Sequence, residues 1–334
     1  MMKKIKYIVL MLSMAAMLAP ATYVHAVTIK IATLSPEGTF WMKQMRAGAE
    51  EIKQKTDGRV KFKFYPGGVM GNDESVLRKI RVGQLQGGAI TIGNLSKSVP
   101  ETTVYGLPFL FSDLEQASEV RKESDPMLMS LIEENGFVSF GVAQGGFTYL
   151  MSKNLIKGFD DLKNQKSWVP EKSDIGLAVY EYIGVAPISL PLSDVLTGLQ
   201  TGMINNIITS PIGALALQWY THVDYVVDLP LNYLTAMMVI DKKVFNKLSE
   251  EDQAVLREVM GRVYREIDKQ NLTDNIEARK ALIKQGVKFT VLTPQEKQEW
   301  LKAGDYVIDE MVKKYNYDKV FYDTVMSKRA TAPK

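Results

Sequence analysis

The sequence contains no cysteine and only two histidines among its 334 residues. Without cysteine the chain has no thiolate nucleophile, no thiolate zinc site and no disulfide framework. His25 falls in an N-terminal segment that we expect to be removed, so His222 is the one imidazole left for acid–base or nucleophilic chemistry. We therefore expect no enzymatic activity, no metal site and no cofactor, and we expect His222 to pack or to lie at the surface.

Nucleotide-binding loops are also missing. Pro66–Gly71 is rich in glycine, but it has neither the Lys-Ser/Thr pair of a phosphate loop nor the full dinucleotide spacing. We interpret this segment as a shaped turn. Asp160 and Asp161 precede Leu162 in a turn-like stretch, and a helix cap explains them better than a metal site does.

The N-terminus has the pattern of an export signal. Three lysines at positions 3, 4 and 6 precede an apolar run from Ile8 to Ala19, and small residues surround the end of Val24-His25-Ala26. A membrane anchor is the alternative, but roughly 20 apolar residues are needed to span a bilayer. We expect a signal peptide over residues 1–26, cleaved after Ala26, and export of the remaining chain.

The mature chain has no excess charge of either sign. The whole sequence has 41 basic and 38 acidic residues, and residues 1–26 hold three lysines and no acid, so 38 of each sign remain. A formal charge of zero gives no support to nucleic-acid binding. A chain of this length usually forms two domains, and no Pro-rich or Ser-rich linker separates them.

Strand and helix patterns alternate along the chain. In the first half, strand patterns occupy residues 27–32, 60–64 and 89–92, and helical patterns occupy residues 42–52 and 72–83. This succession predicts an α/β fold with a largely parallel sheet. A capping box, Ser112-x-x-Glu115, predicts the start of the next helix.

A second α/β set follows an apolar strand over residues 137–142, which we expect to leave the first domain. Its strand candidates are residues 167–169, 188–190 and 206–209. From Ser249 to Lys284 an uninterrupted helical stripe predicts a helix on the order of 50 Å long, shared by both domains. A kink near Gly261, or a break near Asn271, is the alternative.

Several ordered segments together resemble the solute-binding proteins of tripartite ATP-independent periplasmic (TRAP) transporters, in the branch of the dicarboxylate-binding proteins. The segments that carry the resemblance are Tyr65–Gly71, Gly106–Phe111, Asp160–Lys163, Val169-Pro170, Pro191–Val195 and Gly198–Gly202. No single segment is specific, but their order and spacing cover most of the chain.

The resemblance implies a two-domain periplasmic binding protein of the Venus-flytrap type, with a long helix bracing both α/β domains. We expect domain I at residues 27–142 and about 232–275, and domain II at residues 143–231 and about 276–334. The expected partners are a small-molecule ligand in the interdomain cleft and the membrane subunits of a TRAP transporter, with no nucleic acid. The expected location is the periplasm.

The resemblance also directs attention to positions where relatives hold a ligand carboxylate with arginine. Here Trp168 takes the position before Val169-Pro170, and Phe147 takes the position after Gly146. These replacements favour aromatic and apolar contacts over anion binding. The alternative for Trp168 is core packing beside a hinge.

The remaining candidate ligand contacts come from both domains. In domain II, Thr209 and Ser210 are expected to orient one polar group. In domain I, either Phe40 or Trp41 is expected to cover the ligand. Glu37 is a candidate partner for a cation or hydroxyl group of the ligand, with ordinary surface charge as an equal alternative. The complete set of expected ligand-binding residues is Trp168, Phe147, Tyr149, Thr209, Ser210, Phe40, Trp41, Glu37, Asn94 and Pro170.

Three functions follow from these observations. The first is a TRAP-type binding protein for an apolar, aromatic or weakly polar ligand. The second is a binding protein for an organic monocarboxylate, held by backbone N–H groups and by a cation such as Lys172. The third is a periplasmic lipid carrier that works without a transporter.

Overall fold

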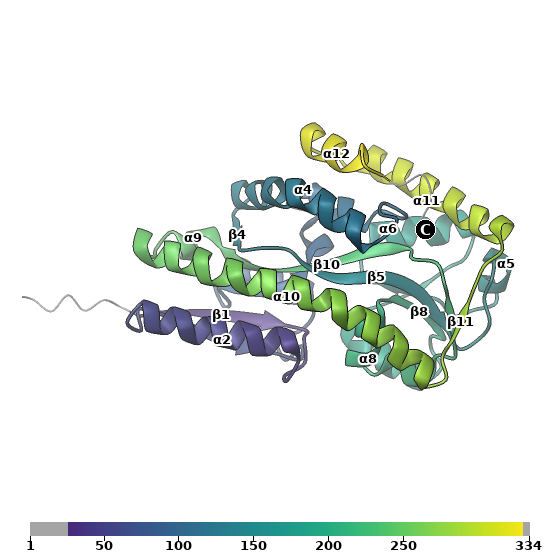
Figure 1. The fold of residues 1–334 in the computed structure, drawn as a ribbon, viewed down its shortest axis with the longest axis horizontal. Coiled ribbons are helices and arrows are strands. Elements are labelled where there is room, and N and C mark those ends of the chain that lie inside the picture. The colour runs from purple at the N-terminus through teal and green to yellow at the C-terminus, as the bar shows by residue number, and fades with distance from the viewer. Residues whose placement is uncertain (1–25, 330–334) are drawn as a thin grey trace, which may run out of the picture.

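The structure is a computed structural model that describes residues 26–329. Apart from Ala26, the expected signal peptide lies outside the described residues. The chain forms two α/β domains side by side, joined by long strands and one long helix (Figure 1). The predicted fold class is confirmed, while the predicted domain boundaries stay a prediction.

The first domain begins with three strands and two helices that follow the predicted alternation. They are β1 (Val27–Thr33), α2 (Phe40–Lys55), β2 (Val60–Tyr65), α3 (Asp73–Arg81) and β3 (Gly87–Thr91). Strand β1 pairs in parallel with both β2 and β3. Its alternate residues Ile29 and Ile31 are fully buried, as the period of two predicts.

Short helices and one long helix complete this part of the chain. They are η1 (Ile92–Leu95), η2 (Pro100–Gly106) and α4 (Leu114–Glu134), followed by strand β4 (Phe137–Ser139). The predicted capping box at Ser112 is wrong by one residue. Helix α4 begins after Asp113, whose carboxylate accepts a hydrogen bond from the backbone N–H of Gln116.

The second domain has shorter elements around its own core. Its strands are β6 (Trp168–Pro170), β7 (Ile188–Leu190), β8 (Asn206–Thr209), β9 (Tyr225–Val227) and β11 (Lys288–Thr290). Its helices are α5 (Phe159–Leu162), α6 (Asp174–Ile183), η3 (Leu192–Asp194), α7 (Val195–Gln200), α8 (Pro211–Ala216) and η4 (Trp219–His222). Strands β6 and β7 form a separate parallel pair.

Two ten-residue strands join the sheets of the two domains. They are β5 (Ala143–Ser152) and β10 (Asn232–Asp241), and the strand order is β11-β9-β5-β10-β3-β1-β2. Strand β5 pairs antiparallel with β8, β9 and β10, and β10 pairs antiparallel with β3. The prediction of a largely parallel sheet is therefore wrong at its centre, because strands that carry the chain between domains run against their neighbours.

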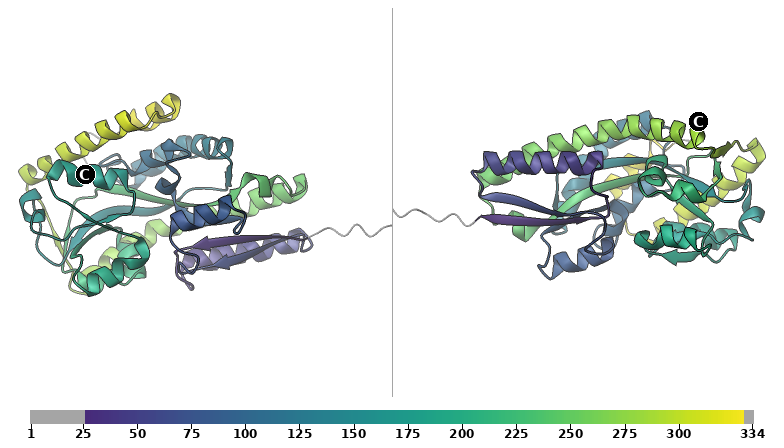
Figure 2. Two further views of the ribbon diagram at one scale, coloured as in Figure 1. Left: turned by 180° about the vertical axis from the view of Figure 1, so that it is seen from behind. Right: turned by 90° about the horizontal axis from the view of Figure 1, so that it is seen from below.

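After the short helix α9 (Lys242–Phe245), helix α10 (Glu250–Lys284) runs along both domains (Figures 1 and 2). Its 35 residues form one continuous helix that begins after the cap Ser249. Its first half packs into a first-domain core through Leu256 and Ile267, and its end packs into a second-domain core through Leu282. The predicted bracing helix is confirmed without a break at Asn271.

The C-terminal segment crosses back between the domains. Helix α11 (Pro294–Lys314) packs on α6, and α12 (Lys319–Met326) packs on α4. The predicted cap at the start of α11 is present, because Thr293 and Glu296 exchange the two hydrogen bonds of a capping box. The assignment of residues 276–334 to the second domain stays a prediction.

Candidate functional site

The two domains touch through the N-terminus of α3 and the turn that follows β6. The amide nitrogen of Asn72 donates a hydrogen bond to the Glu171 carboxylate at 3.1 Å. The Lys172 ammonium forms an ion pair with Glu74. Lys172, a candidate cation for a ligand carboxylate, is therefore engaged by the opposite domain.

Trp168 lies in the core of the second domain. Its side chain is almost fully buried, and its ring lies edge-on to Trp219 with centroids 5.5 Å apart. The indole N–H donates a hydrogen bond to the backbone carbonyl of Leu190 at 3.0 Å. Both the ring and the indole N–H of Trp168 thus have partners inside the second domain. This geometry agrees with core packing, the alternative role that the sequence left open for Trp168. Its predicted contact with ligand stays a prediction.

Polar side chains gather at the end of β8, beside β5. Tyr149 of β5 is in register with Thr209 of β8. Ser210 follows directly and caps α8, since its hydroxyl accepts a hydrogen bond from the backbone N–H of Gly213 at 3.3 Å. The sequence had placed Tyr149, Thr209 and Ser210 in one candidate site, and the structure brings them together.

The phenol of Tyr149 is half-buried. Burial raises its pKa, while the nearby Arg279 acts in the opposite direction. Arg279 forms a bidentate ion pair with Asp228, at 2.8 and 2.7 Å, so its charge is already neutralised. Tyr149 therefore offers a neutral hydroxyl, which donates one hydrogen bond and accepts others.

Phe147 lies further along β5, toward the first domain. It is half-buried, packs against the first-domain core and lies 5.5 Å from the ring of Tyr233. Pro170, at the end of β6, is exposed. Phe147 thus packs against the first domain, whereas Pro170 lies next to the interdomain contacts of Glu171 and Lys172.

The first-domain aromatic candidates pack away from the polar group on β8. Phe40 and Trp41 are half-buried at the start of α2, against the core that α10 covers. Trp41 lies edge-on to Tyr264 of α10, with centroids 5.3 Å apart. Either ring as a cover for ligand stays a prediction, and both have packing partners in the structure.

Glu37 is exposed and held by its own domain. Its carboxylate accepts two hydrogen bonds from the guanidinium of Arg46, at 2.9 and 2.6 Å. The hydrogen bond from Arg46 lowers the pKa of Glu37. This pairing matches the surface-charge alternative for Glu37.

Asn94 contacts the buried carboxyl group of Asp73, a residue that the sequence indicated only as part of the start of a helix. The Asn94 amide, on the exposed side of η1, donates a hydrogen bond to Asp73 at 2.9 Å, and the backbone N–H of Thr91 donates a second at 3.0 Å. Burial raises the pKa of Asp73 to about 6. Asp73 lies between Asn72 and Glu74, the two residues that contact the second domain, but its carboxyl group is buried within the first domain.

The signal for Asp73 was present but ambiguous. An acid in the first turn of a helix is the ordinary complement to the helix dipole. Only the fold shows that this acid points into the protein, toward β3 and η1, instead of toward solvent.

Neither a metal centre nor a membrane span emerges from residues 26–329. Within that range, histidine, aspartate and glutamate side chains form no group of three or more that could hold a metal ion. No helix in the same range is long and apolar enough to cross a bilayer.

Known proteins share both the sequence pattern and the fold. The family model of the bacterial extracellular solute-binding proteins, family 7, matches residues 31–315. The 2,3-diketo-L-gulonate-binding periplasmic protein YiaO of Escherichia coli K12 is 27% identical over 209 residues, 61% of this chain and 63% of that protein. The chain spans 48% and 62% of the lengths of the first two curated relatives that it matches.

Solved structures agree on the fold. A TRAP periplasmic solute binding protein from Shewanella oneidensis with bound succinate has a TM-score of 0.83 at 20% identity, over 91% of this chain and all of that chain. A second, from Haemophilus influenzae RdAW with bound L-gulonate, has a TM-score of 0.82 at 20% identity, over 90% and 99% of the two chains.

Proposed function

Because the chain belongs to family 7 of the bacterial extracellular solute-binding proteins, we propose that it is the periplasmic receptor of a TRAP-type importer. The family consists of solute-binding receptors and not of enzymes. The match over residues 31–315 carries this proposal, since it includes both domains and the long helix. The receptor captures its ligand between the domains and passes it to membrane subunits.

The ligand that we propose is a small, hydroxylated organic acid. The relatives and structural neighbours described above bind diketogulonate, succinate and gulonate, all of them polar acids. The expectation of an apolar or aromatic ligand rested on Trp168 and Phe147, and Trp168 has a complete set of packing partners. It therefore gives little support to an aromatic ligand.

Neutral hydrogen-bonding groups take the place of arginine in this proposal. Tyr149 and Thr209 present hydroxyl groups from the second domain, and Asn94 presents its amide from the first. Hydroxyls and amides bind both the hydroxyl groups and the carboxylate of a sugar acid, although more weakly than a bidentate guanidinium binds the carboxylate. This arrangement favours ligands with several hydroxyl groups over simple dicarboxylates.

A thermal-shift screen of the purified protein tests the ligand class. The panel contains L-gulonate, D-glucuronate, D-galacturonate, succinate, benzoate and a fatty acid, because a ligand that binds only the folded state raises the melting temperature. We expect the largest shift with a sugar acid. A shift confined to benzoate or the fatty acid would refute a hydroxylated ligand, and native mass spectrometry of the protein as purified would identify a ligand retained from the cell.

A further inference from the structure

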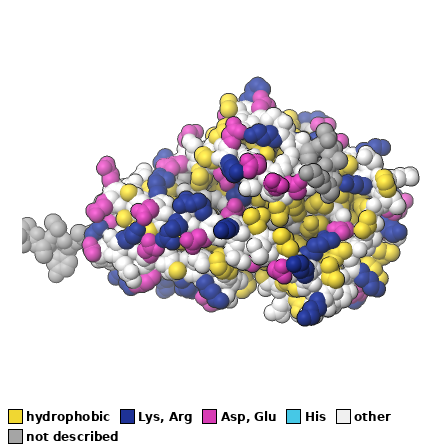
Figure 3. Space-filling view, viewed as in Figure 1, with side chains coloured by type: hydrophobic (Ala, Val, Ile, Leu, Met, Phe, Trp, Pro, Cys, Tyr) yellow, Lys and Arg dark blue, Asp and Glu magenta, His cyan; other side chains and the backbone are white. Residues whose placement is uncertain are grey.

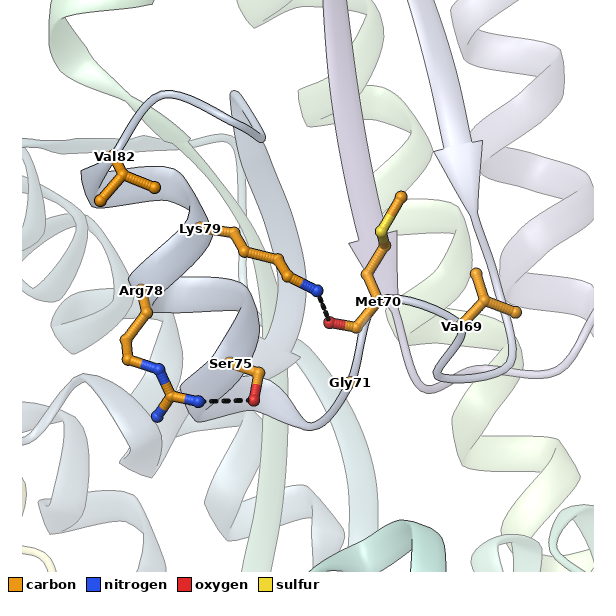
Figure 4. Close-up of a pocket in the computed structure, with 7 residues that line it drawn as sticks. All are labelled: Val69, Met70, Gly71, Ser75, Arg78, Lys79 and Val82. Carbon is orange, nitrogen blue, oxygen red and sulfur yellow. Dashed lines mark hydrogen bonds between the residues drawn. The ribbon is translucent and has the colours of Figure 1, made fainter.

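A groove on the first domain lies outside the candidate ligand site. It has a volume of about 290 Å³ and lies between the glycine-rich loop after β2 and helix α3 (Figure 4). Seven residues line it: Val69, Met70, Gly71, Ser75, Arg78, Lys79 and Val82.

The loop that forms one wall of the groove is held on the helix. The ammonium of Lys79 donates a hydrogen bond to the backbone carbonyl of Met70 at 2.6 Å. Gly71 has a φ of 91°, and a Cβ there would lie 2.9 Å from the Cβ of Ser75. Because glycine alone adopts this turn without strain or a clash, the groove has a defined shape.

The groove combines exposed apolar ends with positive charge. Val69 and Val82 are 71% and 77% exposed, so neither is covered by the described part of the protein. Lys79 extends between them toward Met70 (Figure 4). Arg78 lies on the side of α3, donates a hydrogen bond to Ser75, pairs with Glu74 at 3.4 Å and is 59% exposed. None of the seven lining residues is acidic, so the groove complements a segment that carries both negative charge and an apolar side chain.

Helix α3 connects this groove to the polar contacts between the two domains. Its first residues make the contacts with Glu171 and Lys172 described above, while its middle and end line the groove. A partner bound in the groove therefore contacts the element that touches the second domain.

The hydrophobic surface in Figure 3 is a competing candidate for a docking site. On that face, apolar side chains gather over the second domain. The exposed apolar residues of this domain include Ile276, Ile283 and Val291. No charge pattern identifies what covers that surface. The groove on α3, by contrast, is lined by Arg78 and Lys79, which favour an acidic partner.

We propose that the groove between Val69 and Val82 docks an acidic segment, with an apolar side chain at its tip, of the transporter's membrane subunits. This inference rests on the proposed function, because it assumes that the protein delivers its ligand to a membrane partner. The exposed valines contact the apolar side chain, and Arg78 and Lys79 contact the carboxylates.

Photo-crosslinking tests the proposal with the full-length mature protein. The photoreactive residue p-benzoylphenylalanine is introduced at Val82 or, as a matched control, at Val291, which is also 77% exposed but lies in the second domain. Each protein is mixed with the cognate membrane subunits in lipid nanodiscs, and cross-linked subunits are identified by mass spectrometry. We expect the cross-link at Val82 to exceed that at Val291 by about five-fold or more.

A charge reversal separates docking from chance proximity. Arg78→Glu, combined with the photoreactive residue at position 82, is expected to reduce that cross-link by about five-fold or more. The control reversal Lys247→Glu, at an exposed site of the same domain, is expected to leave it unchanged. Lys247→Glu should also leave the thermal shifts of the acid panel unchanged.

Three outcomes overturn the docking site while leaving the receptor function intact. They are equal cross-links at both valines, a cross-link at Val291 alone, and recovery of Val82 cross-linked only to anionic lipid. If no position cross-links to the subunits and no acid of the panel raises the melting temperature, the proposed receptor function fails together with the groove.

Discussion

Asp73 shows how a single buried acid responds to pH. The residue is 6% exposed, and burial raises the pKa of its carboxyl group from the ordinary value of 3.8 to about 6 in spite of the hydrogen bonds from Thr91 and Asn94. Between these two values the folded protein binds more protons at this site than the unfolded chain does. The contribution of Asp73 to the free energy of unfolding is therefore fully present below pH 3.8 and is lost as the pH rises through about 6.

Replacing Asp73 with asparagine removes this pH dependence, because the amide is neutral at every pH and its oxygen still accepts both hydrogen bonds. We expect Asp73→Asn to raise the free energy of unfolding at pH 7, relative to the native protein, by about 1 to 3 kcal/mol. The difference should shrink toward zero at pH 4. Urea denaturation of both proteins at the two pH values measures it, and an equal difference at both would contradict the raised pKa.

Trp168 and Trp219 offer a matched test of packing against ligand contact. Each is almost fully buried, and they contact each other edge to face. We expect Trp168→Phe to lower the free energy of unfolding by about 1 to 3 kcal/mol, through lost contacts and the lost hydrogen bond to Leu190. Trp219→Phe should cost a similar amount.

Ligand affinity distinguishes the two interpretations of Trp168. If its role is packing, both variants should bind the acid found in the thermal-shift screen with nearly native affinity in isothermal titration calorimetry. A large loss of affinity in Trp168→Phe alone would restore Trp168 as a ligand contact.

The candidate site could be predicted from the sequence only in part. Tyr149, Thr209 and Ser210 follow from motif positions, and the structure places them together on neighbouring strands. The pairing of Glu37 with Arg46 is absent from the sequence pattern, because it depends on where two side chains of a loop and a helix meet. The same is true of Asp73, whose burial depends on β3 and η1.

At the scale of the elements, β5 contains an irregularity where it passes between the domains. The pairing of β5 with β10 shifts register opposite Leu234 and Thr235, next to Gly146. Gly146 has a φ of 82°, and a Cβ there would lie 2.6 Å from the side-chain amide carbon of Asn275 on α10. Glycine at this position allows the crossing strand to lie close against the long helix.

Two alanine substitutions separate the backbone strain from the steric clash. Gly136 also has a positive φ, of 91°, but a Cβ there would contact nothing within 4 Å. We expect Gly136→Ala to cost about 1 kcal/mol of stability through strain alone, and Gly146→Ala to cost about 2 to 4 kcal/mol through strain and the clash with Asn275. Thermal denaturation of the two variants measures the difference. Equal losses of stability would show that α10 shifts at little cost to remove the clash with Asn275.

Secondary structure was more predictable than sheet direction. Helix α10 and the cap at Thr293 follow from local patterns of apolar residues and capping groups, which act within a few residues. The predicted cap of α4 was Ser112 and the observed cap is Asp113, because both side chains are good caps and the sequence does not rank them. The antiparallel pairs of β5 and β10 depend on segments more than 80 residues apart, such as Phe147 and Tyr233.

At the scale of the whole molecule, a few polar side chains make contacts between the two domains. Asn72 and Glu74 of the first domain meet Glu171 and Lys172 of the second. Because Lys172 and Glu74 are 58% and 36% exposed, water and salt screen their attraction, which is worth about 0.2 to 1 kcal/mol. An attraction of this size changes an equilibrium between an open and a closed form by up to about five-fold.

Removing the interdomain ion pair should weaken ligand binding without touching the ligand. Ligand binds the closed form more tightly, so a change that favours opening lowers the apparent affinity. We expect Lys172→Met to raise the dissociation constant for the acid found in the thermal-shift screen by about two- to five-fold, and we expect this effect to shrink in 1 M salt. Isothermal titration calorimetry at low and high salt measures both.

Lys313→Met is the matched control, because Lys313 pairs with Glu310 on the same helix and does not bridge the domains. It should bind the acid with native affinity at either salt concentration. An equal loss of affinity in both variants would indicate a general effect of removing positive charge from the protein. A loss in Lys172→Met that persists unchanged in high salt would instead place Lys172 in direct contact with a ligand carboxylate, the role first considered for it.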